Sequence, residues 1–314
     1  MKQITFGDIV NLNISPSLCY QWVSEMIANK KESILPPKIS MKPADEVFCN
    51  VMPSILSEKV GGVKIVTRYP ERNPSLDSKI LLFDVEKGDF LALMDANWIT
   101  AMRTGAVAAH SILLLAKKCF AELGIVGLGN TARATLLALA SMMPDREMHI
   151  KLLRYKGQEK LFAERFAEYP NFHFSYVEDY RTLIKGSDVV ISCVTFFHED
   201  ICTDDCFDEG VLVVPVHTRG FTNCDLFFDK VFADDYGHVK HFKNFEKFKY
   251  FSEVCDVVNG NMLGRENDRE RILAYNVGVS IHDIYFAMHI YQMLKEKDSL
   301  VDIDLGEPIE KFWI

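Results

Sequence analysis

The chain has 314 residues, of which 48% are hydrophobic and 25% charged, and its formal net charge at pH 7 is −9. This composition is typical of a soluble globular protein and excludes an intrinsically disordered chain. The acidic balance disfavours nucleic acid as a partner, because a phosphate backbone attracts basic surfaces. A chain of this length exceeds the size at which one hydrophobic core usually stops growing, so we expect two domains.

The longest strongly apolar stretch covers residues 106–116 and is interrupted by His110 and Ser111. It is much shorter than the ~20 residues of a membrane-spanning helix. The opening sequence MKQITFGDIV contains an early aspartate and no apolar block, which disfavours a secretory signal. The eight cysteines are too few for a disulfide scaffold and indicate reduced thiols. We therefore expect a cytoplasmic protein with no membrane partner.

Residues 4–93 favour short strands and turns, as in GGVKIVTRYP and ILLFDVEKGDFLALMD. Apolar runs flank the sequence EKGD in the second of these, which predicts a hairpin turn between two pairing strands. From residue 98 to residue 118, apolar residues recur at helical spacing and no proline interrupts them. This change of period predicts a long helix that leads into the second part of the chain.

Beyond residue 119, short apolar strands alternate with helices of ordinary length. This alternation is typical of a parallel sheet with crossover helices, so the expected fold class is α/β with a Rossmann-type doubly wound sheet. The pattern of residues 270–297 predicts one long helix, which we expect to return with the tail to pack on the first region. The predicted domains are a Rossmann dinucleotide-binding domain at 119–284 and a discontinuous α+β domain at 1–118 and 285–314.

The sequence ELGIVGLGNTARATLLALA, residues 122–140, places a strand, two close glycines and a helix in the order that a dinucleotide-binding turn requires. Gly127 permits a tight turn, Gly129 lets backbone amides approach a pyrophosphate, and Ala132 lets the helix pack closely against the strand. The N-terminus of the helix then faces the diphosphate. An ordinary strand-turn-helix would also use such glycines, but the alternating context favours a cofactor. The cofactor-binding residues predicted here are Gly127, Gly129, Asn130, Thr131 and Ala132.

The expected second strand ends in KLLRYKGQEK, where Arg154 and Lys156 precede the carboxylate of Glu159. An acidic residue at the strand end would bind the free ribose hydroxyls of NAD, whereas cations suit the 2′-phosphate of NADP. We therefore expect NADP or NAD as the cofactor, with NADP favoured. The alternative is that both cations are solvated surface residues.

Two basic residues are candidates for the chemistry of hydride transfer, which needs a clamp for an anionic substrate and an acid or base near the reacting carbon. Lys64 lies in an apolar strand after two glycines, where burial would lower its pKa and make it a usable base. Arg103 lies early in the predicted long helix, beside Thr104, and its guanidinium could hold a carboxylate. The alternative for each residue is an ordinary surface cation.

Four segments resemble successive motifs of the ornithine cyclodeaminase and mu-crystallin family: VGGVKIVTRYPERNP, FDVEKGDFLALMDANWITAMRTGAVAA, LGIVGLGNTARA and VVNGNMLGRENDRERILAYNVGVSIHDI. The likeness runs in order from about Leu35 to about Tyr291. It implies a two-domain subunit in which a Rossmann domain adjoins a discontinuous substrate-binding domain, and a homodimer joined through the sheets of the substrate domains. It also implies NAD(P)-linked chemistry on an amino acid or a cyclic imine.

At positions matched to that family, Lys64 would face the substrate as acid or base, and Arg103 would hold the substrate carboxylate. Lys38, in LPPKIS, stands where the family often has a second carboxylate-binding arginine. A lysine keeps the charge of that arginine but loses its bidentate fork. The further cofactor-binding residues that we expect are Thr104 beside Arg103, and Val194 and Thr195 after the strand VVISCV.

One departure from the family concerns the catalytic aspartate of the cyclodeaminases. Aligning Asp225 and Leu226 with the family's acidic-Leu pair puts Arg219 at the position of that aspartate, which disfavours ornithine cyclisation. Arg219 would then bind a second acidic group on the substrate, and His217 would relay a proton near neutral pH. The alternatives are that Arg219 contacts a cofactor phosphate and that His217 is only a loop residue.

Three functions remain open at this stage. The leading prediction is an NADP-preferring reductase or dehydrogenase that acts on a small amino acid or its imine. The enzyme alternative is an ornithine cyclodeaminase, a redox-neutral lyase that uses bound NAD and forms proline and ammonia. The third is a cofactor-holding binding protein without catalysis, as in the mu-crystallin branch.

Two other patterns favour structural roles. His198, Cys202 and Cys206 are spaced by four residues, but no fourth ligand is spaced nearby, so we expect no metal. The phenylalanines of HVKHFKNFEKFKYF, residues 238–251, alternate with lysines in a way that could bind single-stranded nucleic acid. Because they recur every third residue, they instead favour a helical turn with a buried edge near the active-site mouth.

Overall fold

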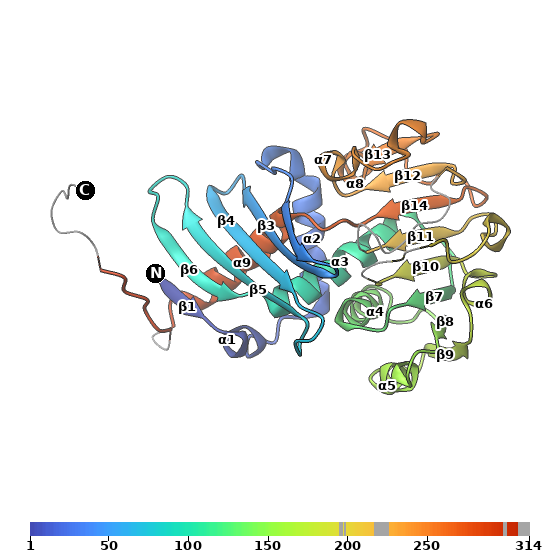
Figure 1. Ribbon diagram of the computed structural model, residues 1–314, viewed down its shortest axis with the longest axis horizontal. Helices are drawn as coiled ribbons and strands as arrows, with labels where there is room; N and C mark the ends of the chain where they lie inside the picture. Colours follow the sequence, from blue (N-terminus) through green and yellow to red (C-terminus); the bar gives the residue numbers. More distant parts are fainter. Residues whose placement is uncertain (195–196, 198, 217–225, 298–299, 307–314) are drawn as a thin grey trace.

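The computed structural model describes the chain except for residues 195–196, 198, 217–225, 298–299 and 307–314. Its strands form two sheets in separate halves of the molecule (Figure 1), which we call sheet A and sheet B. Helix α3 (Asn97–Leu115) contacts strands of both sheets. The α/β fold with two halves agrees with the expected architecture.

Sheet A is built from the first 95 residues in the order β1-β6-β5-β4-β3-β2. Only β1 and β6 are parallel neighbours; the other pairs are antiparallel. The predicted EKGD hairpin joins β5 to β6, where the Asp84 carboxylate accepts hydrogen bonds from the N–H groups of Glu86 and Lys87. The strands are β1 (Lys2–Ile4), β2 (Ile39–Ala44), β3 (Val47–Ile55), β4 (Val60–Arg68), β5 (Leu76–Asp84) and β6 (Phe90–Asp95).

The two faces of sheet A have different surroundings. Helix α9 (Ser280–Leu294) packs against β3, β4 and β5 on one face, where residues such as Ile80 and Leu82 are buried. Alternate residues point to the other face, and there Ile39, Ile65 and Leu93 are exposed. The face away from α9 is therefore mixed, with Lys79 directly beside Ile65, and the described part of the chain leaves its apolar side chains exposed.

Sheet B is a parallel sheet of eight strands in the order β13-β12-β14-β11-β10-β7-β8-β9. Strand β7 lies between β8 and β10, so the chain changes direction across the sheet at β7, where doubly wound folds bind ligands at the carboxyl ends of the strands. The strands are β7 (Glu122–Val126), β8 (Met148–Leu153), β9 (Phe172–Val177), β10 (Val189–Ser192), β11 (Leu212–Pro215), β12 (Lys230–Ala233), β13 (Phe251–Glu253) and β14 (Ile272–Tyr275).

The prediction of one helix over residues 270–297 is wrong in its first part. Residues Ile272–Tyr275 form the fully buried strand β14 between β11 and β12. A short apolar run cannot be distinguished by periodicity from a buried helix segment. Gly278 has φ +79°, a left-handed conformation that separates strand from helix. Helix α9 begins at Ser280, so the predicted domain boundary between residues 284 and 285 falls inside it.

Helix α3 is the centre of the helical layer, and it agrees with the helix predicted over residues 98–118. By length and composition it could cross a membrane, but 67% of its most apolar window is buried inside the protein. At Gly105 an added Cβ would lie 2.4 Å from the Ala134 Cβ, so the α3–α4 contact needs a glycine. The other α-helices are α1 (Phe6–Val10), α2 (Pro16–Ala28), α4 (Asn130–Met142), α5 (Gln158–Glu164), α6 (Tyr180–Ile184), α7 (Tyr236–Val239) and α8 (Val254–Val258).

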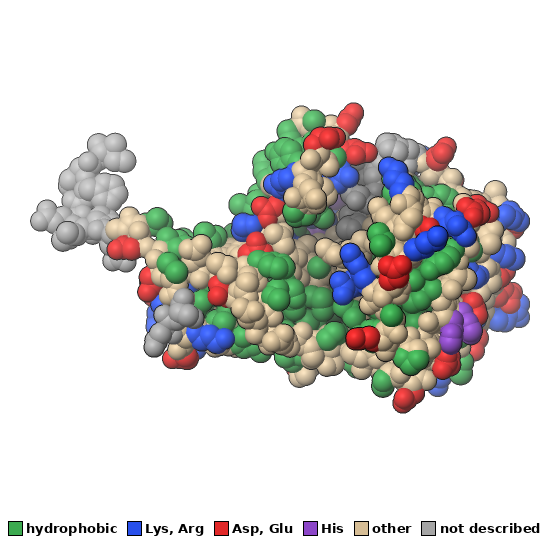
Figure 2. All heavy atoms as spheres, turned by 90° about the horizontal axis from the view of Figure 1, so that it is seen from below, with side chains coloured by type: hydrophobic (Ala, Val, Ile, Leu, Met, Phe, Trp, Pro, Cys, Tyr) green, Lys and Arg blue, Asp and Glu red, His purple; other side chains and the backbone are tan. Residues whose placement is uncertain are grey.

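The phenylalanine-rich stretch at residues 238–251 packs against the core of sheet B, as predicted, but not as one helical turn. It contains the 3-10 turn η3 (Phe245–Lys247) and leads into β13. Figure 2 shows acidic and basic side chains interspersed over the half of the molecule that holds sheet B. The packed residues are Phe242, Phe245, Phe248 and Phe251; the two other 3-10 turns are η1 (Lys30–Glu32) and η2 (Asp204–Cys206).

Candidate active site

Lys64 is buried in the middle of sheet A, on the face covered by α9. Its side chain is 1% exposed, and its Nζ lies 2.8 Å from Oδ1 of Asp283. Strand β4 comes close to α9 because Gly62 has no side chain: an added Cβ would lie 2.6 Å from Ile284 Cδ1. Gly62, two residues before Lys64, thus explains how a strand lysine reaches a helix carboxylate.

Asp283 joins Lys64 to Arg103. Its Oδ1 accepts a hydrogen bond from Lys64 Nζ and another from Arg103 Nε, each at 2.8 Å. Burial by itself would raise the pKa of the Asp283 carboxyl, but the two cations together hold it below its ordinary value. The carboxylate also lies in the first turn of α9, where the helix dipole favours a negative charge. Asp283 is therefore an ionised carboxylate that orients both basic side chains.

The pKa of Lys64 is lowered to about 8, mainly by burial, while the charge of Asp283 opposes this shift and that of Arg103 adds to it. A lysine with such a pKa can donate and regain a proton near neutral pH. Arg103 bonds Asp283 only through Nε, and neither Nη atom donates to another described residue. The two ends of its guanidinium fork can therefore hold a carboxylate.

Lys38 belongs to the same cluster, although 26 positions separate it from Lys64 in the sequence. Its Nζ donates a hydrogen bond to the carbonyl of Val277 at 2.8 Å, and its backbone N–H donates to Nε2 of His238 at 3.2 Å. Burial lowers the pKa of Lys38. The fold thus gathers the three predicted basic residues, Lys38, Lys64 and Arg103, around the start of α9.

The glycine turn after β7 has the geometry of a phosphate-binding turn. Gly127 has φ +83°, and an added Cβ would lie 2.8 Å from the Cys193 carbonyl carbon. Gly129 is exposed, and no atom lies within 4 Å of the position of its Cβ. As N-cap of α4, Gly129 provides no side-chain hydrogen bond to the first-turn amides, which are left for an anion. Ala132, in the first turn of α4, is fully buried. These residues fit a dinucleotide diphosphate.

The remaining predicted cofactor residues lie in different surroundings. Arg154 is half-exposed and pairs with Glu178 at 2.9 Å, and Lys156 lies over the Tyr155 ring. Val194 lies beside Gly127, as a cofactor-edge residue should. The Thr104 hydroxyl donates to the Thr100 carbonyl of its own helix at 2.5 Å. Thr195, His217 and Arg219 lie outside the described residues, as does His198 of the rejected metal pattern.

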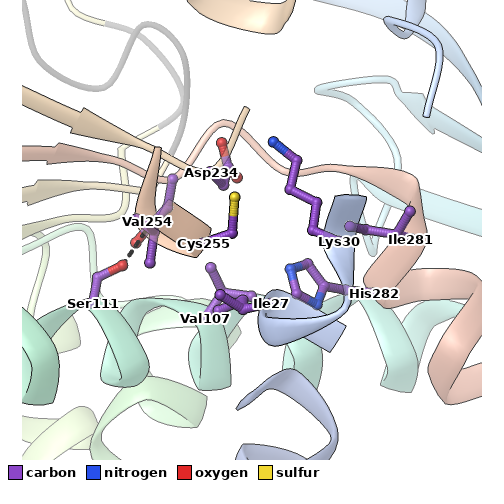
Figure 3. A pocket seen from close by; sticks show the side chains of 10 residues that line it. Ile27, Lys30, Val107, Ser111, Asp234, Val254, Cys255, Ile281 and His282 are labelled. Atoms are coloured by element: carbon purple, nitrogen blue, oxygen red, sulfur yellow. Dashed lines mark hydrogen bonds between the residues drawn. The ribbon is translucent and has the colours of Figure 1, made fainter. Parts of the chain in front are cut away.

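A small cavity with both apolar and polar lining residues lies next to the basic cluster, between α2, α3, α8 and the start of α9 (Figure 3). It has room for at most about one water molecule. Asn276 Nδ2 donates to Ser111 Oγ at 3.0 Å, while Asn276 Oδ1 and His282 Nδ1 have no partner among the described residues. Its polar lining consists of Lys30, Ser111, Asp234, Cys255, Asn276 and His282.

The sequence interpretation missed Asp283, Asp234 and Asn276. Asp283 stands in SIHDIYFAMHI, where a single carboxylate in an apolar helix was a usable signal, because such a residue needs a buried partner. Asp234 and Asn276 follow β12 and β14 directly. Their signal was the position at the carboxyl end of a parallel strand, but β14 was assigned to a helix.

A group of acidic and thiol side chains at α8 could resemble a metal site. Glu253, Cys255 and Asp256 bring ligand atoms within 4.8 Å of one another. However, Lys30 pairs with Glu253 and Lys31 with Asp256, and burial raises the pKa of the Cys255 thiol to about 11. The carboxylates are neutralised by lysines and the sulfur stays protonated, so this group is an ion-pair cluster.

The chain matches the sequence pattern of the ornithine cyclodeaminase/mu-crystallin family over residues 7–298. It is 26% identical over 270 residues to a Delta(1)-pyrroline-2-carboxylate reductase of Bacillus cereus, covering 79% of this chain and 82% of that protein. It is 27% identical over 234 residues to the N-((2S)-2-amino-2-carboxyethyl)-L-glutamate dehydrogenase of Staphylococcus aureus, covering 70% and 68% of the two chains. The structure of Thermococcus litoralis Delta(1)-pyrroline-2-carboxylate reductase in complex with NADH and L-proline is similar, with a TM-score of 0.84, 26% identity and coverage of 96% and 100%.

Proposed function

Because the chain belongs to the ornithine cyclodeaminase/mu-crystallin family, we propose that it is an NAD(P)-dependent reductase of a small cyclic imine carboxylate, or of the imine of a small amino acid. The observation that carries this proposal is the buried cluster of Lys64, Arg103 and Asp283 in one half of the molecule, with the phosphate-binding turn in the other. Relatives named as reductases or dehydrogenases of such substrates support it.

The carboxylate of the substrate is held by Arg103 and Lys38. Arg103 offers both Nη atoms, since its Nε alone is used by Asp283. Lys38 offers the N–H groups of its Nζ that do not donate to the Val277 carbonyl. The buried Arg103 and the partly buried Lys38 favour a carboxylate strongly, because little water competes with it. Arg219 would add a clamp for a second acidic group, as expected from its position in the sequence.

Lys64 supplies the proton. The cofactor, when bound, provides the hydride for the imine carbon, and the imine nitrogen must gain or keep a proton. With a pKa of about 8, Lys64 is mostly protonated at neutral pH and gives its proton without large cost. Asp283 holds the Lys64 ammonium in place. His217 would relay the proton onward.

NADP is the preferred cofactor in this proposal. Arg154 and Lys156 follow β8 directly, and the ion pair of Arg154 with Glu178 is half-exposed and exchangeable. Changing Arg154 to Ala is expected to weaken NADPH binding about fivefold to tenfold and NADH binding less than twofold, because one phosphate contact is removed. Fluorescence titration of both cofactors measures this. Equal weakening of NADH binding and NADPH binding would contradict a contact of Arg154 with the 2′-phosphate and would favour NAD as the cofactor.

The protein acts as a homodimer in this proposal, with the uncovered face of sheet A as the interface. Ile39, Ile65 and Leu93 are exposed there by 60%, 46% and 38%, and neighbouring strands bring their rows together. An exposed sheet face with several large apolar side chains is typical of an interaction site. We place the protein in the cytoplasm, because its described cysteines are free thiols.

The experiment that tests the function is a titration of the purified protein with NADPH and NADH, followed by a panel of cyclic imines and 2-oxo acids with ammonia. Oxidation of the reduced cofactor by a cyclic imine carboxylate is the expected result. Proline and ammonia formed from ornithine without added oxidant would make the protein a cyclodeaminase. Cofactor binding with no turnover on either panel would make it a binding protein.

A further inference from the structure

Two adjacent aspartates, Asp234 and Asp235, follow strand β12 directly. Both carboxylate oxygens of Asp234 are used: Oδ1 accepts from the Val277 N–H at 3.2 Å, and Oδ2 from the Gly278 N–H at 2.9 Å. Figure 3 shows Asp234 directly beside the loop that runs from sheet B to α9. A buried carboxylate with two backbone donors holds its loop firmly.

This loop, residues 276–279, is the connector from β14 to α9, and it touches both proposed carboxylate-binding cations. The Val277 carbonyl accepts the hydrogen bond from Lys38 Nζ. Gly278 lies against the Arg103 guanidinium, since an added Cβ would be 3.3 Å from Nη1. The peptide between Val277 and Gly278 thus donates its N–H to Asp234 and accepts a hydrogen bond from Lys38 at its carbonyl. The position of the connector decides where Lys38 and Arg103 present their charges.

Asp235 fixes the backbone of Lys38 from the other side. It pairs with Lys30 at 2.8 Å and with His238 Nδ1 at 2.6 Å. Because Nδ1 of His238 donates to this carboxylate, Nε2 is left as an acceptor, and it receives the Lys38 backbone N–H. Asp235 therefore holds the backbone of Lys38 through His238. Asp234 holds the Lys38 ammonium through the Val277–Gly278 peptide.

We propose that Asp234 is a positioning residue for the substrate carboxylate: by binding the Val277 and Gly278 amides, it sets the connector so that Lys38 and Arg103 converge on one anion. This inference rests on the proposed function and names a residue that acts through others. It also couples the two halves, because Asp234 belongs to the cofactor-binding sheet while Arg103 and Lys38 serve the substrate. A shift of about 1 Å at such a site is enough to impair the reaction.

The variant Asp234→Asn tests the proposal with almost no change in volume. An amide has one acceptor oxygen, so its NH2 group must face one of the two backbone donors, and one hydrogen bond is lost. The connector then loosens at Val277 or Gly278. The expected result is a rise of about tenfold in the KM for pyrroline-2-carboxylate, a smaller change in kcat, and a Kd for the reduced cofactor within about twofold of the parent value.

A double-mutant cycle with Lys38→Ala separates positioning from simple loss of stability. Because Asp234 acts through Lys38 and Arg103 together, the double variant is expected to raise the KM by less than the product of the two single effects. Multiplied effects of the two changes would overturn the proposal. Asp256→Asn is the matched control, since Asp256 is a carboxylate of the helix α8 that pairs with Lys31. Its KM is expected to stay at the parent value.

Gly278→Ala is the second variant, for the case that Asp234→Asn does not fold. It leaves Asp234 in place and adds a Cβ at φ +79° against Arg103, so it should raise the KM in the same direction. The dissociation constant of pyrrole-2-carboxylate, a planar carboxylate of similar size, is measured in parallel with cofactor present. If Asp234→Asn binds pyrrole-2-carboxylate as tightly as the parent protein does, the inference alone is overturned. If the parent protein does not bind pyrrole-2-carboxylate, both the inference and the proposed function are overturned.

Discussion

The basic cluster and the glycine turn are opposite ways of building a binding site. In the cluster, Lys64, Arg103 and Asp283 are buried and paired with one another. At the turn, Gly129 and Asn130 are exposed and the amides of α4 have no side-chain cap. The first site is set by packing before a ligand arrives, and the second is kept open by residues without side chains. Damage to the cluster should therefore impair chemistry and stability together, whereas a side chain added at the open position of Gly129 should impair binding alone.

The largest effect is expected from Lys64→Ala, which removes the proposed proton donor. We expect kcat/KM for imine reduction to fall by about 10³-fold, within the usual range for a general acid. Binding of the reduced cofactor should change less than about twofold, because the turn lies in the other half. Steady-state kinetics and a cofactor titration measure both. Activity above a tenth of the parent value would remove Lys64 from the mechanism.

The next effect is expected from Asp283→Asn, which leaves two buried cations without their shared carboxylate. We expect a loss of about 3 kcal/mol in the free energy of unfolding and of about 100-fold in kcat/KM. Asp283 raises the pKa of Lys64, so its removal lowers that pKa further. Reduction needs the protonated lysine, and the parent rate should fall above about pH 8. The decline should begin at lower pH in the variant. An unshifted pH profile would show that Asp283 acts only in folding.

A pair of glycine variants compares the open position of the turn, Gly129, with its packed position, Gly127. Gly129→Val adds a side chain in open space, so it should weaken cofactor binding about tenfold or more while the melting temperature stays within about 2 °C. Gly127→Ala places a Cβ 2.8 Å from the Cys193 backbone at φ +83°, and it should cost about 2 kcal/mol or more. Similar melting temperatures in both variants would contradict this distinction.

The smallest effect concerns acid stability near the cluster. Burial, with the charge of Arg103 adding to it, lowers the pKa of His282 from 6.5 to about 3. As pH falls below 6.5, His282 binds a proton in the unfolded chain but not in the folded chain. The free energy of unfolding therefore falls by about 1.4 kcal/mol per pH unit until about pH 3. Between pH 7 and pH 5 the parent should lose about 2 kcal/mol more than His282→Asn. Denaturant unfolding at both pH values measures the difference, and parallel losses would show that His282 titrates normally in the fold.

The local patterns of the chain were sufficient for several elements. The EKGD hairpin, the long helix through Arg103 and the strand-turn-helix at Gly127 were all predicted, because each depends on neighbours within a few residues. The buried run at Ile272–Tyr275 was misassigned, since a strand in the centre of a parallel sheet has no alternation to report. That error also hid Asn276 and the connector.

By itself, the sequence determined the class of the fold, the place of the glycine turn and the identity of the basic residues Lys38, Lys64 and Arg103. Only the tertiary structure decided that these three cations converge, and that Asp283 pairs with Lys64 and Arg103. The reason is physical: Asp283 is separated by 219 positions from Lys64 and by 180 from Arg103, and no local periodicity specifies a partner at that distance. Packing of α9 on sheet A brings these charges together, and in a buried environment their pairing decides which of them can move a proton.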